Sequence, residues 1–342
     1  MKINFDIYST PEGPHIPPEL RMLRLTSGAL VAQAIYIFAY LGIPDLLRNG
    51  PKTAQHLAKE AGANALMLSR LMRFLSTIDV VTELAPLTFD LTRVGGTLCR
   101  SHRSAIRDNA LLIGAPFYWN AMGELLHQIQ TGENSFTKAH CTDLFSYLAT
   151  HADAATAFSA AMESSAELSI NGILSTYDFS HCRWIVDVGG GRGALLRGVL
   201  KRYQSVRGTL YDSESVLTNV TINAAMEPRL ARVAGNFLDS VVIGADTYIL
   251  HRVLHDWSDE NAIRIVRNCR KAMLPTGRLL VIETSPECSP NNWSGLDLLM
   301  MMMLDGKERT ELELRSILLA SDFKTNMVLR SNPYWIFEAV PQ

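Results

Sequence analysis

The sequence lacks the cysteine patterns that would indicate a metal centre or a secreted disulfide scaffold. Its five cysteines include no C-x-x-C pair and no spacing typical of metal ligands: Cys99, Cys141, Cys182, Cys269 and Cys288. Scattered cysteines of this kind are typical of reduced thiols in a cytoplasmic protein. The N-terminal residues also lack the apolar core of a signal peptide. These absences predict a cytoplasmic location and no resident metal ion.

An excess of charge of either sign is also missing. The chain has 32 Lys and Arg residues and 34 Asp and Glu residues, which gives a formal net charge of −2. Nucleic-acid-binding proteins, by contrast, usually carry a basic face. One uncharged stretch, residues 26–44, approaches the ~20 apolar residues of a membrane span. It contains Gln33 and two glycines and runs directly into polar residues. We therefore predict a helix buried between two protein surfaces, as in a dimer, and neither a nucleic acid nor a membrane as a partner.

The length of the chain predicts two domains, because 342 residues exceed what a single core usually holds. Residues 19–47 form an apolar helical pattern that ends near Gly42 and Pro44. Two further helical segments and a possible hairpin follow, which together have the pattern of a winged helix. Helical patterns continue to residue 173, and we place the boundary so that the domains are residues 1–176 and 177–342. The predicted elements of the winged helix are residues 53–60, 64–78, 80–84 and 88–91.

A winged helix also raises the alternative of a DNA-binding regulator. The second helix of the motif offers only Arg70 and Arg73, and a modest basic group follows at Arg100, Arg103 and Arg107. Because the chain as a whole is slightly acidic, we favour a packing role for this domain. The regulator hypothesis predicts salt-sensitive binding to DNA.

The second domain begins with a strand, a glycine turn and a helix, in residues 184–203. The glycines of this turn, in the sequence DVGGGRG, let the backbone approach a ligand closely, and this arrangement commonly cradles a nucleotide. The turn also fits the loose dinucleotide-binding pattern. However, the carboxylate of Asp187 would repel a pyrophosphate and suits an ammonium group, such as that of S-adenosylmethionine.

Strands and helices alternate in the remainder of the chain, which predicts an α/β domain with a mostly parallel sheet and helices on both faces. The second strand ends in Asp212, 19 residues after Gly193. This offset is close to the ~20 residues at which an acid can hold ribose hydroxyls. The later strands are predicted at residues 208–211, 230–233, 247–250 and 278–283, with a terminal hairpin at 324–329 and 334–340.

A histidine and two glutamates are predicted where the sheet would bind ligands. His255 lies between the fourth strand and the next helix, Glu283 ends the fifth strand, and Glu308 lies on the loop before a later helix. A carboxylate bonded to one imidazole nitrogen leaves the other free to accept a proton. This chemistry fits the methylation of a hydroxyl, because a phenol with a pKa of ~10 is rarely ionised at neutral pH and needs a base.

Three motifs in this order resemble the class I S-adenosylmethionine-dependent O-methyltransferases of the plant caffeate type: residues 187–193, 254–260 and 306–310. Bacterial relatives in that family act on phenazines, anthracyclines and other aromatic natural products. The likeness covers nearly the whole chain and implies a Rossmann-like catalytic domain behind a winged-helix dimerisation domain. It also implies a homodimer that uses S-adenosyl-L-methionine and releases S-adenosyl-L-homocysteine.

The resemblance assigns roles to individual residues. His255 would be the general base, flanked by Glu283 and Glu308. The cofactor-binding positions would be Asp187, Gly189, Gly190, Gly191, Asp212, Asn236, Phe237, His251 and Trp257. The substrate-binding positions would be Trp119, Phe158, Met162, Met300 and Asp256. The chain departs from the family where Asn236 replaces an acid near the adenine; the asparagine carbonyl can still accept the hydrogen bond, so we expect weaker but not lost cofactor binding. A smaller departure is His251, which replaces a lysine or small polar residue near the cofactor.

The sequence therefore predicts an O-methyltransferase of secondary metabolism that acts on an aromatic hydroxyl. Some relatives with this fold bind the same cofactor but catalyse decarboxylation or hydroxylation, and in these the base position can be altered. The presence of His255 with both glutamates argues against that alternative.

Overall fold

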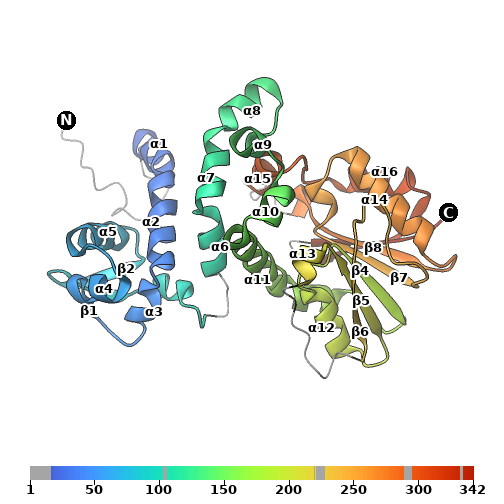
Figure 1. Cartoon of the computed structure of the whole chain (residues 1–342), viewed down its shortest axis with the longest axis horizontal. Helices are drawn as coiled ribbons and strands as arrows, with labels where there is room; N and C mark the ends of the chain where they lie inside the picture. Colours follow the sequence, from blue (N-terminus) through green and yellow to red (C-terminus); the bar gives the residue numbers. More distant parts are fainter. Residues whose placement is uncertain (1–16, 103–105, 219, 221–227, 289–294, 332–333) are drawn as a thin grey trace. The chain divides into compact units, whose positions relative to one another are not determined.

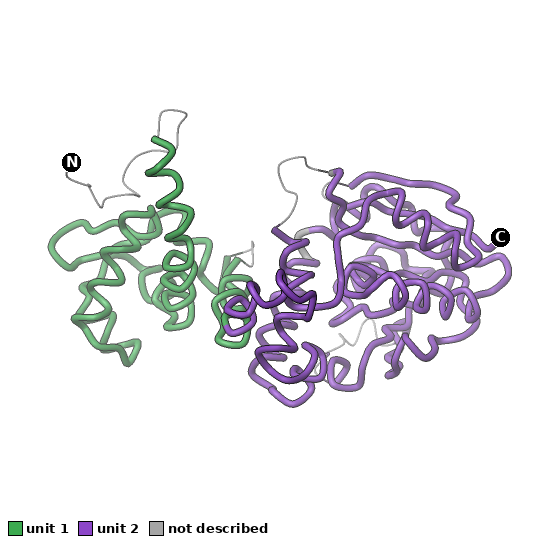
Figure 2. Tube along the Cα trace, turned by 90° about the horizontal axis from the view of Figure 1, so that it is seen from above, with its two compact units in different colours: residues 1–119 green, residues 120–342 purple. Residues whose placement is uncertain are grey.

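The computed structural model describes residues 17–102, 106–218, 220, 228–288, 295–331 and 334–342. The chain divides into two compact units, Met1–Trp119 and Asn120–Gln342 (Figure 2). The first unit is built around one hydrophobic core and the second around two.

The first unit begins with three helices in place of one continuous apolar helix. Helix α1 spans Pro18–Thr26, α2 Gly28–Tyr40 and α3 Ile43–Leu47. Ser27 interrupts the pattern and directs its Oγ back to the Leu23 carbonyl at 2.8 Å. Gly42 ends α2 with a φ of +68°, a backbone conformation that glycine adopts readily. Among the described residues no single helix could cross a membrane; α1 and α2 meet the length and composition only as a pair, which is bent by 44°.

The predicted winged-helix elements are all present. Helices α4 (Ala54–Ala61) and α5 (Ala65–Thr77) are followed by the hairpin β2 (Val81–Ala85) and β3 (Thr88–Leu91), and the short β1 (Lys52–Thr53) pairs with β3. Side chains of Thr53 and Asn64 cap α4 and α5 by accepting backbone N–H groups. The core beneath them contains fully buried Phe38, Met72 and Phe89. The remaining elements before the second unit are η1 (Gly95–Leu98), α6 (Ile106–Ile113) and α7 (Pro116–Gly123), and α7 extends past the division between the units.

Four helices that we predicted in the first domain belong to the second unit. They are α8 (Leu125–Thr131), α9 (Ser135–His140), α10 (Leu144–Thr150) and α11 (Ala152–Thr176). The predicted boundary between residues 176 and 177 thus differs from the observed division, which follows Trp119. The reason is that Ile173 and Leu174 of α11 are buried in the same core cluster as the side chains of α12 and the sheet.

The second unit is organised around a seven-stranded sheet with the order β6-β5-β4-β7-β8-β10-β9 (Figure 1). All neighbours are parallel except for the two antiparallel pairs that β10 forms with β8 and β9. The strands are β4 (Trp184–Val188), β5 (Arg207–Asp212), β6 (Leu230–Ala234), β7 (Thr247–His251), β8 (Arg278–Thr284), β9 (Phe323–Ser331) and β10 (Tyr334–Pro341). Every strand that we predicted in this domain is confirmed.

Helices cover both faces of the sheet, as the strand sequences require. In β8, Leu279 and Val281 enter one core cluster, whereas Leu280 and Ile282 enter the other. Alternation of this kind buries both faces of a parallel sheet. The helices of the sheet domain are α12 (Ala194–Arg202), α13 (Glu214–Leu217), α14 (Asp259–Ala272), α15 (Gly295–Met303) and α16 (Glu311–Leu319), with short 3₁₀ turns η2 (Leu254–Asp256) and η3 (Pro286–Cys288).

The order of the strands fixes where a ligand would bind. The chain runs outward from β4 to β6 on one side of the sheet and from β7 to β8 on the other, so the direction reverses between β4 and β7. Open α/β sheets bind ligands in the crevice at such a switch point, beyond the carboxyl ends of the strands. The ends of β4, β5, β7 and β8 place the predicted residues Asp187, Asp212, His251 and Glu283 at this one edge.

Candidate active site

The glycine turn after β4 has room that a side chain would fill. Gly189 and Gly191 have φ values of +68° and +58°, which disfavour any other residue. A Cβ on Gly189 would lie 2.9 Å from Val253 Cγ2, whereas the space around Gly191 is open. The N–H of Gly191 donates to Asp212 Oδ2 at 2.8 Å, which ties the turn to the end of β5. The turn is thus closely packed on its inner side and open where a ligand would approach.

Asp187 lies beneath this turn with only 1% of its surface exposed. A Cβ on Gly190 would fall 2.5 Å from Asp187 Oδ2, so the carboxyl group fits under a glycine and no larger residue. Burial raises the pKa of Asp187 to about 7, and the charge of Asp212 adds to this effect. Its Oδ1 has no hydrogen-bond partner among the described residues. A buried acid with one unpaired oxygen below an open turn fits a ligand that presents a cationic group.

Aromatic side chains border the same turn. The Phe237 ring lies 3.3 Å from the Cβ position of Gly189 and meets Trp257 edge-on, with ring centroids 5.7 Å apart. Trp257 also stacks on Phe145 at 5.7 Å. Asn236, the neighbour of Phe237, accepts the Leu238 N–H at 3.0 Å through its carbonyl. The structure therefore brings Phe237 and Trp257 together beside the glycine turn, where a flat ring could pack against them.

His255 lies across the switch point in η2 and is 4% exposed. Its Nδ1 is 2.7 Å from Glu308 Oε1, a direct hydrogen bond, and 3.9 Å from Glu283 Oε2. Its Nε2 lies 3.4 Å from Asp256 Oδ1. The two predicted glutamates thus differ in role, because only Glu308 is bonded to the ring.

Glu283 holds the backbone that leads into His255. Its Oε1 accepts the N–H groups of Val253 and Leu254 at 3.0 and 2.8 Å. Glu308 is itself fixed, since Thr284 donates to its Oε2 and its own N–H donates to Asp297 at 2.9 Å. The imidazole therefore meets carboxylates whose positions are set by other bonds.

The electrostatics of this cluster favour a strongly basic imidazole. Burial alone lowers the pKa of His255, but the charges of Glu283 and Asp256 and the hydrogen bond to Glu308 outweigh it and raise that pKa to about 9. Burial raises the pKa of Glu283 to about 7. At neutral pH the cluster thus holds a proton that it can release or exchange.

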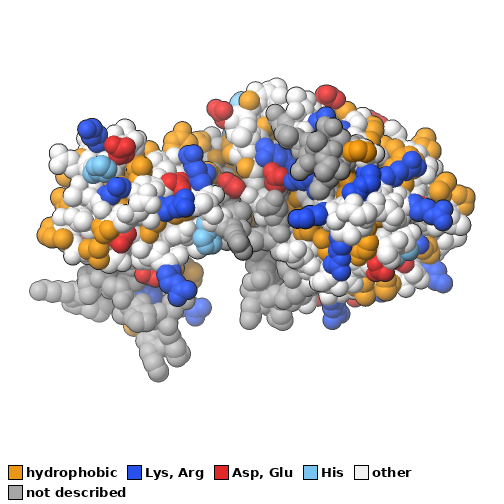
Figure 3. Space-filling model, turned by 90° about the horizontal axis from the view of Figure 1, so that it is seen from below, with side chains coloured by type: hydrophobic (Ala, Val, Ile, Leu, Met, Phe, Trp, Pro, Cys, Tyr) orange, Lys and Arg blue, Asp and Glu red, His pale blue; other side chains and the backbone are white. Residues whose placement is uncertain are grey.

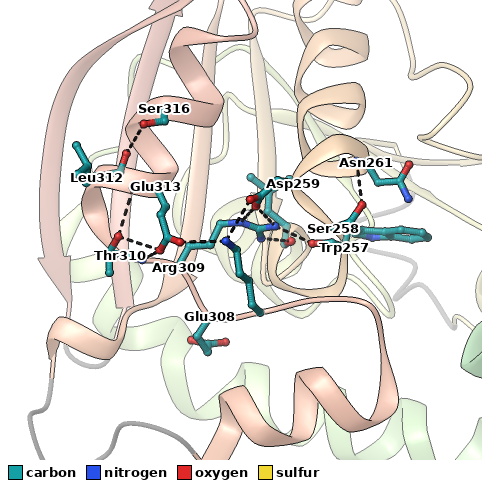
Figure 4. Close-up of polar contacts among 12 residues, drawn as sticks. Trp257, Ser258, Asp259, Asn261, Glu308, Arg309, Thr310, Leu312, Glu313 and Ser316 are labelled. Carbon is teal, nitrogen blue, oxygen red and sulfur yellow. Dashed lines mark hydrogen bonds and ion pairs between the residues drawn. The ribbon is translucent and has the colours of Figure 1, made fainter. Parts of the chain in front are cut away.

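Arg309 is a site residue that the sequence analysis did not identify (Figure 4). It is 2% exposed and donates to the carbonyls of Leu254 and Trp257 at 2.5 and 2.7 Å, and to Asp259 Oδ1 at 2.9 Å. These carbonyls flank His255 and Asp256, so one guanidinium holds both ends of the loop that carries the histidine. Its place in the 306–310 motif was the only signal in the sequence.

The same motif contains Gly306, which packs directly against the backbone of His255. A Cβ at this position would lie 1.9 Å from the His255 carbonyl oxygen, so only glycine fits. After the motif, Thr310 and Glu313 form a capping box at the start of α16, which fixes where the loop ends (Figure 4).

His251 lies at the end of β7, and its surroundings keep the side chain uncharged, unlike the lysine that many relatives resembling this chain would have there. Its ring meets Tyr334 edge-on at 5.7 Å, and its Nε2 has no hydrogen-bond partner among the described residues. Burial lowers the pKa of His251 to about 3, helped by Arg252. The ring is therefore neutral and supplies no positive charge at this edge.

The predicted substrate-binding residues lie on several elements. Phe158 and Met162 are half-buried on α11, and Met300 is buried on α15. Asp256 borders a pocket in the second unit, which is also lined by Phe145, Trp257 and Met303. Trp119 belongs to the first unit, and its role stays a prediction. No group of three or more His, Cys, Asp or Glu among the described residues is arranged to hold a metal ion.

Comparison with known families gives two matches in one chain. Residues 23–101 match the O-methyltransferase dimerisation domain, and residues 122–324 match the O-methyltransferase domain. These ranges agree with the observed division after Trp119.

Curated relatives match over almost their whole length. The chain is 35% identical to a phenazine O-methyltransferase of Lysobacter antibioticus, over 92% of this chain and 93% of that protein. It is 33% identical to a mitomycin biosynthesis 6-O-methyltransferase of Streptomyces lavendulae, over 94% and 95%. It is also 30% identical to a phenazine-1-carboxylate N-methyltransferase of Pseudomonas aeruginosa, over 90% and 92%.

Solved structures agree with these matches. The structure of LaPhzM superposes with a TM-score of 0.88 at 34% identity, over 96% of this chain and 100% of that one. NcsB1 from neocarzinostatin biosynthesis, in complex with S-adenosylmethionine and 2-hydroxy-5-methyl naphthoic acid, superposes with a TM-score of 0.85 at 28% identity, over 96% and 100%.

Proposed function

The chain belongs to the S-adenosylmethionine-dependent O-methyltransferases, and from that premise we propose that it methylates a phenolic or similar hydroxyl of an aromatic natural product, with His255 as the general base. The observation that carries the proposal is the buried His255–Glu308 pair, bonded at 2.7 Å, at the sheet edge that also bears the glycine turn. NcsB1, whose structure contains both S-adenosylmethionine and a hydroxynaphthoic acid, supports the choice of substrate class.

The hydrogen bond to Glu308 determines which nitrogen of His255 is basic. Nδ1–H donates to Glu308, so Nε2 carries the free lone pair and can take the proton of a substrate hydroxyl. The proton moves to Nε2 as the oxygen attacks, and the carboxylates of Glu308, Glu283 and Asp256 stabilise the resulting imidazolium. The cofactor, when bound, supplies an electrophilic methyl group and a neutral leaving group, so no general acid is needed.

The raised pKa of His255 suits this task. With a pKa of about 9, the imidazole is closer in basicity to a phenolate, whose conjugate acid has a pKa of ~10, than an ordinary histidine of ~6.5. Proton transfer from a phenol is then less uphill. The same shift means that the free enzyme must first lose a proton to become active, so activity should rise with pH.

The cofactor positions follow from the fit of the turn. We assign the orphaned Asp187 and the glycines Gly189, Gly190 and Gly191 to the methionine end of S-adenosyl-L-methionine. Asp212, at the end of β5, would accept from the ribose hydroxyls. The adenine would lie against the aromatic pair Phe237 and Trp257, with Asn236 beside it. The neutral His251, at the end of β7, would lie near the cofactor without supplying a charge.

We also propose a homodimer formed through the first unit. Large apolar side chains of α1 and α2 are exposed, among them Leu25, Leu30 and Tyr40, each 66% exposed. Exposed apolar side chains in this number mark an interaction surface.

A DNA-binding role would favour a single basic stripe on the surface. On the face in Figure 3 the Lys and Arg side chains are instead dispersed over both units. The predicted cytoplasmic location stays a prediction.

The test begins with calorimetric titration of S-adenosyl-L-methionine and S-adenosyl-L-homocysteine, with NAD as the control ligand. Binding of the first two without a response to NAD supports the cofactor assignment, and a panel of phenols, hydroxynaphthoic acids and hydroxyphenazines then identifies the substrate class. Aromatic amines and nitrogen heterocycles belong in the panel because two relatives are named as N-methyltransferases, one for phenazine-1-carboxylate and one for an amino-substituted flavin. Binding of neither cofactor form, together with salt-sensitive retardation of DNA in a gel, would instead support the winged-helix regulator.

A further inference from the structure

One carboxylate of the second unit connects three elements around the glycine turn. Glu163 of α11 accepts from Arg192 in the turn at 3.0 Å and from Arg197 of α12 at 2.6 Å. The two arginines bind different oxygens of the same carboxylate, Oε2 and Oε1. The three side chains are only 23 to 26% exposed, so their attraction is screened less than that of a surface pair.

Arg192 is the only residue with a functional side chain in the turn from Gly189 to Gly193. A glycine-rich segment loses much conformational freedom when it is ordered, so its native shape needs outside anchors. On one side, the N–H of Gly191 is held by Asp212. On the other side, Arg192 is held by Glu163. The turn is therefore fixed from two directions, and Glu163 supplies the anchor that comes from outside the β4–β5 pair.

Glu163 also directly follows Met162, which we assign to the substrate pocket, on the same helix α11. The carboxylate is ionised in this setting: burial raises its pKa, but the hydrogen bonds from Arg197 and Arg192 outweigh that effect and lower it. Because the Glu163 carboxylate bonds both Arg192 and Arg197, a movement of α11 would be transmitted to the turn through Arg192.

We propose that Glu163 is a positioning residue that, through Arg192, holds the glycine turn in its cofactor-binding shape and ties it to the helix that lines the substrate. The inference rests on the proposed function, because it presumes that the turn binds S-adenosyl-L-methionine. Glu163 itself does not contact the reacting atoms; it acts through Arg192, with Arg197 fixing the other carboxylate oxygen.

The experiment is a double-mutant cycle on the full-length protein, read by calorimetric titration with S-adenosyl-L-homocysteine. The variants are Glu163→Gln, Arg192→Gln and the double variant, each accompanied by a measured Tm. Arg315→Gln is the matched control, because Arg315 pairs with Glu311 on α16 at 2.7 Å and has no contact with the turn. Glu163→Asp is added as a conservative variant that keeps the charge on a shorter side chain.

We expect Glu163→Gln and Arg192→Gln each to weaken binding of S-adenosyl-L-homocysteine by about three- to tenfold, and the double variant to be no weaker than the poorer single variant, because residues of one ion pair are coupled. Arg315→Gln should bind like the wild type, and Glu163→Asp should recover part of the affinity. Unchanged affinity in Glu163→Gln with only a lower Tm would show a purely structural contact and overturn the inference, as would additive effects of the two substitutions. If the wild type itself does not bind S-adenosyl-L-homocysteine, the proposed function fails and this inference fails with it.

Discussion

The two halves of the candidate site are built in different ways. On the β4–β5 side the site consists largely of glycine backbone, and Asp187 is left with a buried oxygen that has no partner among the described residues. On the β7–β8 side the oxygens of Glu308 and the backbone around His255 are held by bonds from β8, α15 and the 306–310 motif.

This difference follows from what each half must do. A half that accepts a ligand leaves room and unsatisfied groups, which the ligand then satisfies. A half that positions a base holds that base in place before any ligand arrives, because preorganised groups cost no rearrangement during the reaction. On the β7–β8 side this applies to the bonds around His255, although Glu283 Oε2 and His251 Nε2 there have no hydrogen-bond partner among the described residues. The comparison predicts that substitutions at His255 and at the groups that hold it lower turnover, whereas substitutions at the glycine turn and Asp212 lower cofactor affinity.

The largest expected effect comes from removing the base. His255→Gln should lower kcat by about 10²- to 10⁴-fold, the range that general-base catalysis usually contributes. The Kd for S-adenosyl-L-homocysteine should stay within twofold of the wild type. His127→Gln is the control, because His127 is a partly exposed histidine that also pairs with a glutamate, Glu133, at 2.8 Å. Full activity in His255→Gln would remove the histidine from the mechanism and break the contrast between the halves.

Arg309→Lys tests whether the loop around His255 must be held at both ends. A lysine keeps the charge but cannot donate to the Leu254 carbonyl, the Trp257 carbonyl and Asp259 together. We expect kcat to fall by about 10²-fold, the cost of a base displaced by about 1 Å, and Tm to fall as well. Arg315→Lys on α16 is the matched control. A variant that loses Tm but keeps kcat would show that Arg309 stabilises the fold without positioning the base.

Asp212→Asn addresses the other half of the site. Loss of a charged acceptor should weaken S-adenosyl-L-homocysteine binding by about tenfold and leave kcat at saturating cofactor nearly unchanged. An analogue that lacks the ribose hydroxyls sharpens the result: the wild type should bind it more weakly, and the difference between the two ligands should be smaller in Asp212→Asn, whose amide is a weaker acceptor. If the variant distinguishes the two ligands as strongly as the wild type does, Asp212 is not the ribose acceptor.

The smallest effect is a shift in the pH profile. The base works in its neutral form, and the folded-state pKa of His255 is raised to about 9, so kcat/KM should rise with pH through that region and level off above it. Glu308→Gln removes one of the groups that raise the pKa and should move this rise to lower pH, with a lower plateau because the ring is less well oriented. A profile that is flat from pH 6 to 10 in the wild type would contradict the assignment.

The secondary structure of the second unit was readable from local pattern. Short apolar segments that alternate with helical patterns predicted β5, β6, β7, β8 and the terminal hairpin within a few residues of their observed bounds. These features are local, because a strand depends on residues a few positions apart.

The domain boundary was not readable in this way. Helix α11 has the composition of the helices before it, and only its burial against α12 and the sheet assigns it to the second unit. The family matches at residues 23–101 and 122–324 agree with that assignment.

By itself the sequence determined the class of fold and placed Asp187, Asp212, His255 and Glu283 at one sheet edge, because these depend on local spacing and on the rule that parallel strands end together. The resemblance of three motifs to a known family added the cofactor. Only the tertiary structure decided that Glu308 bonds the imidazole while Glu283 bonds the backbone, that Arg309 spans the loop, and that Glu163 anchors the turn. Each of these contacts joins residues about 30 to 55 positions apart. Which oxygen reaches which nitrogen across that distance depends on how the helices and strands pack, and no local pattern encodes it.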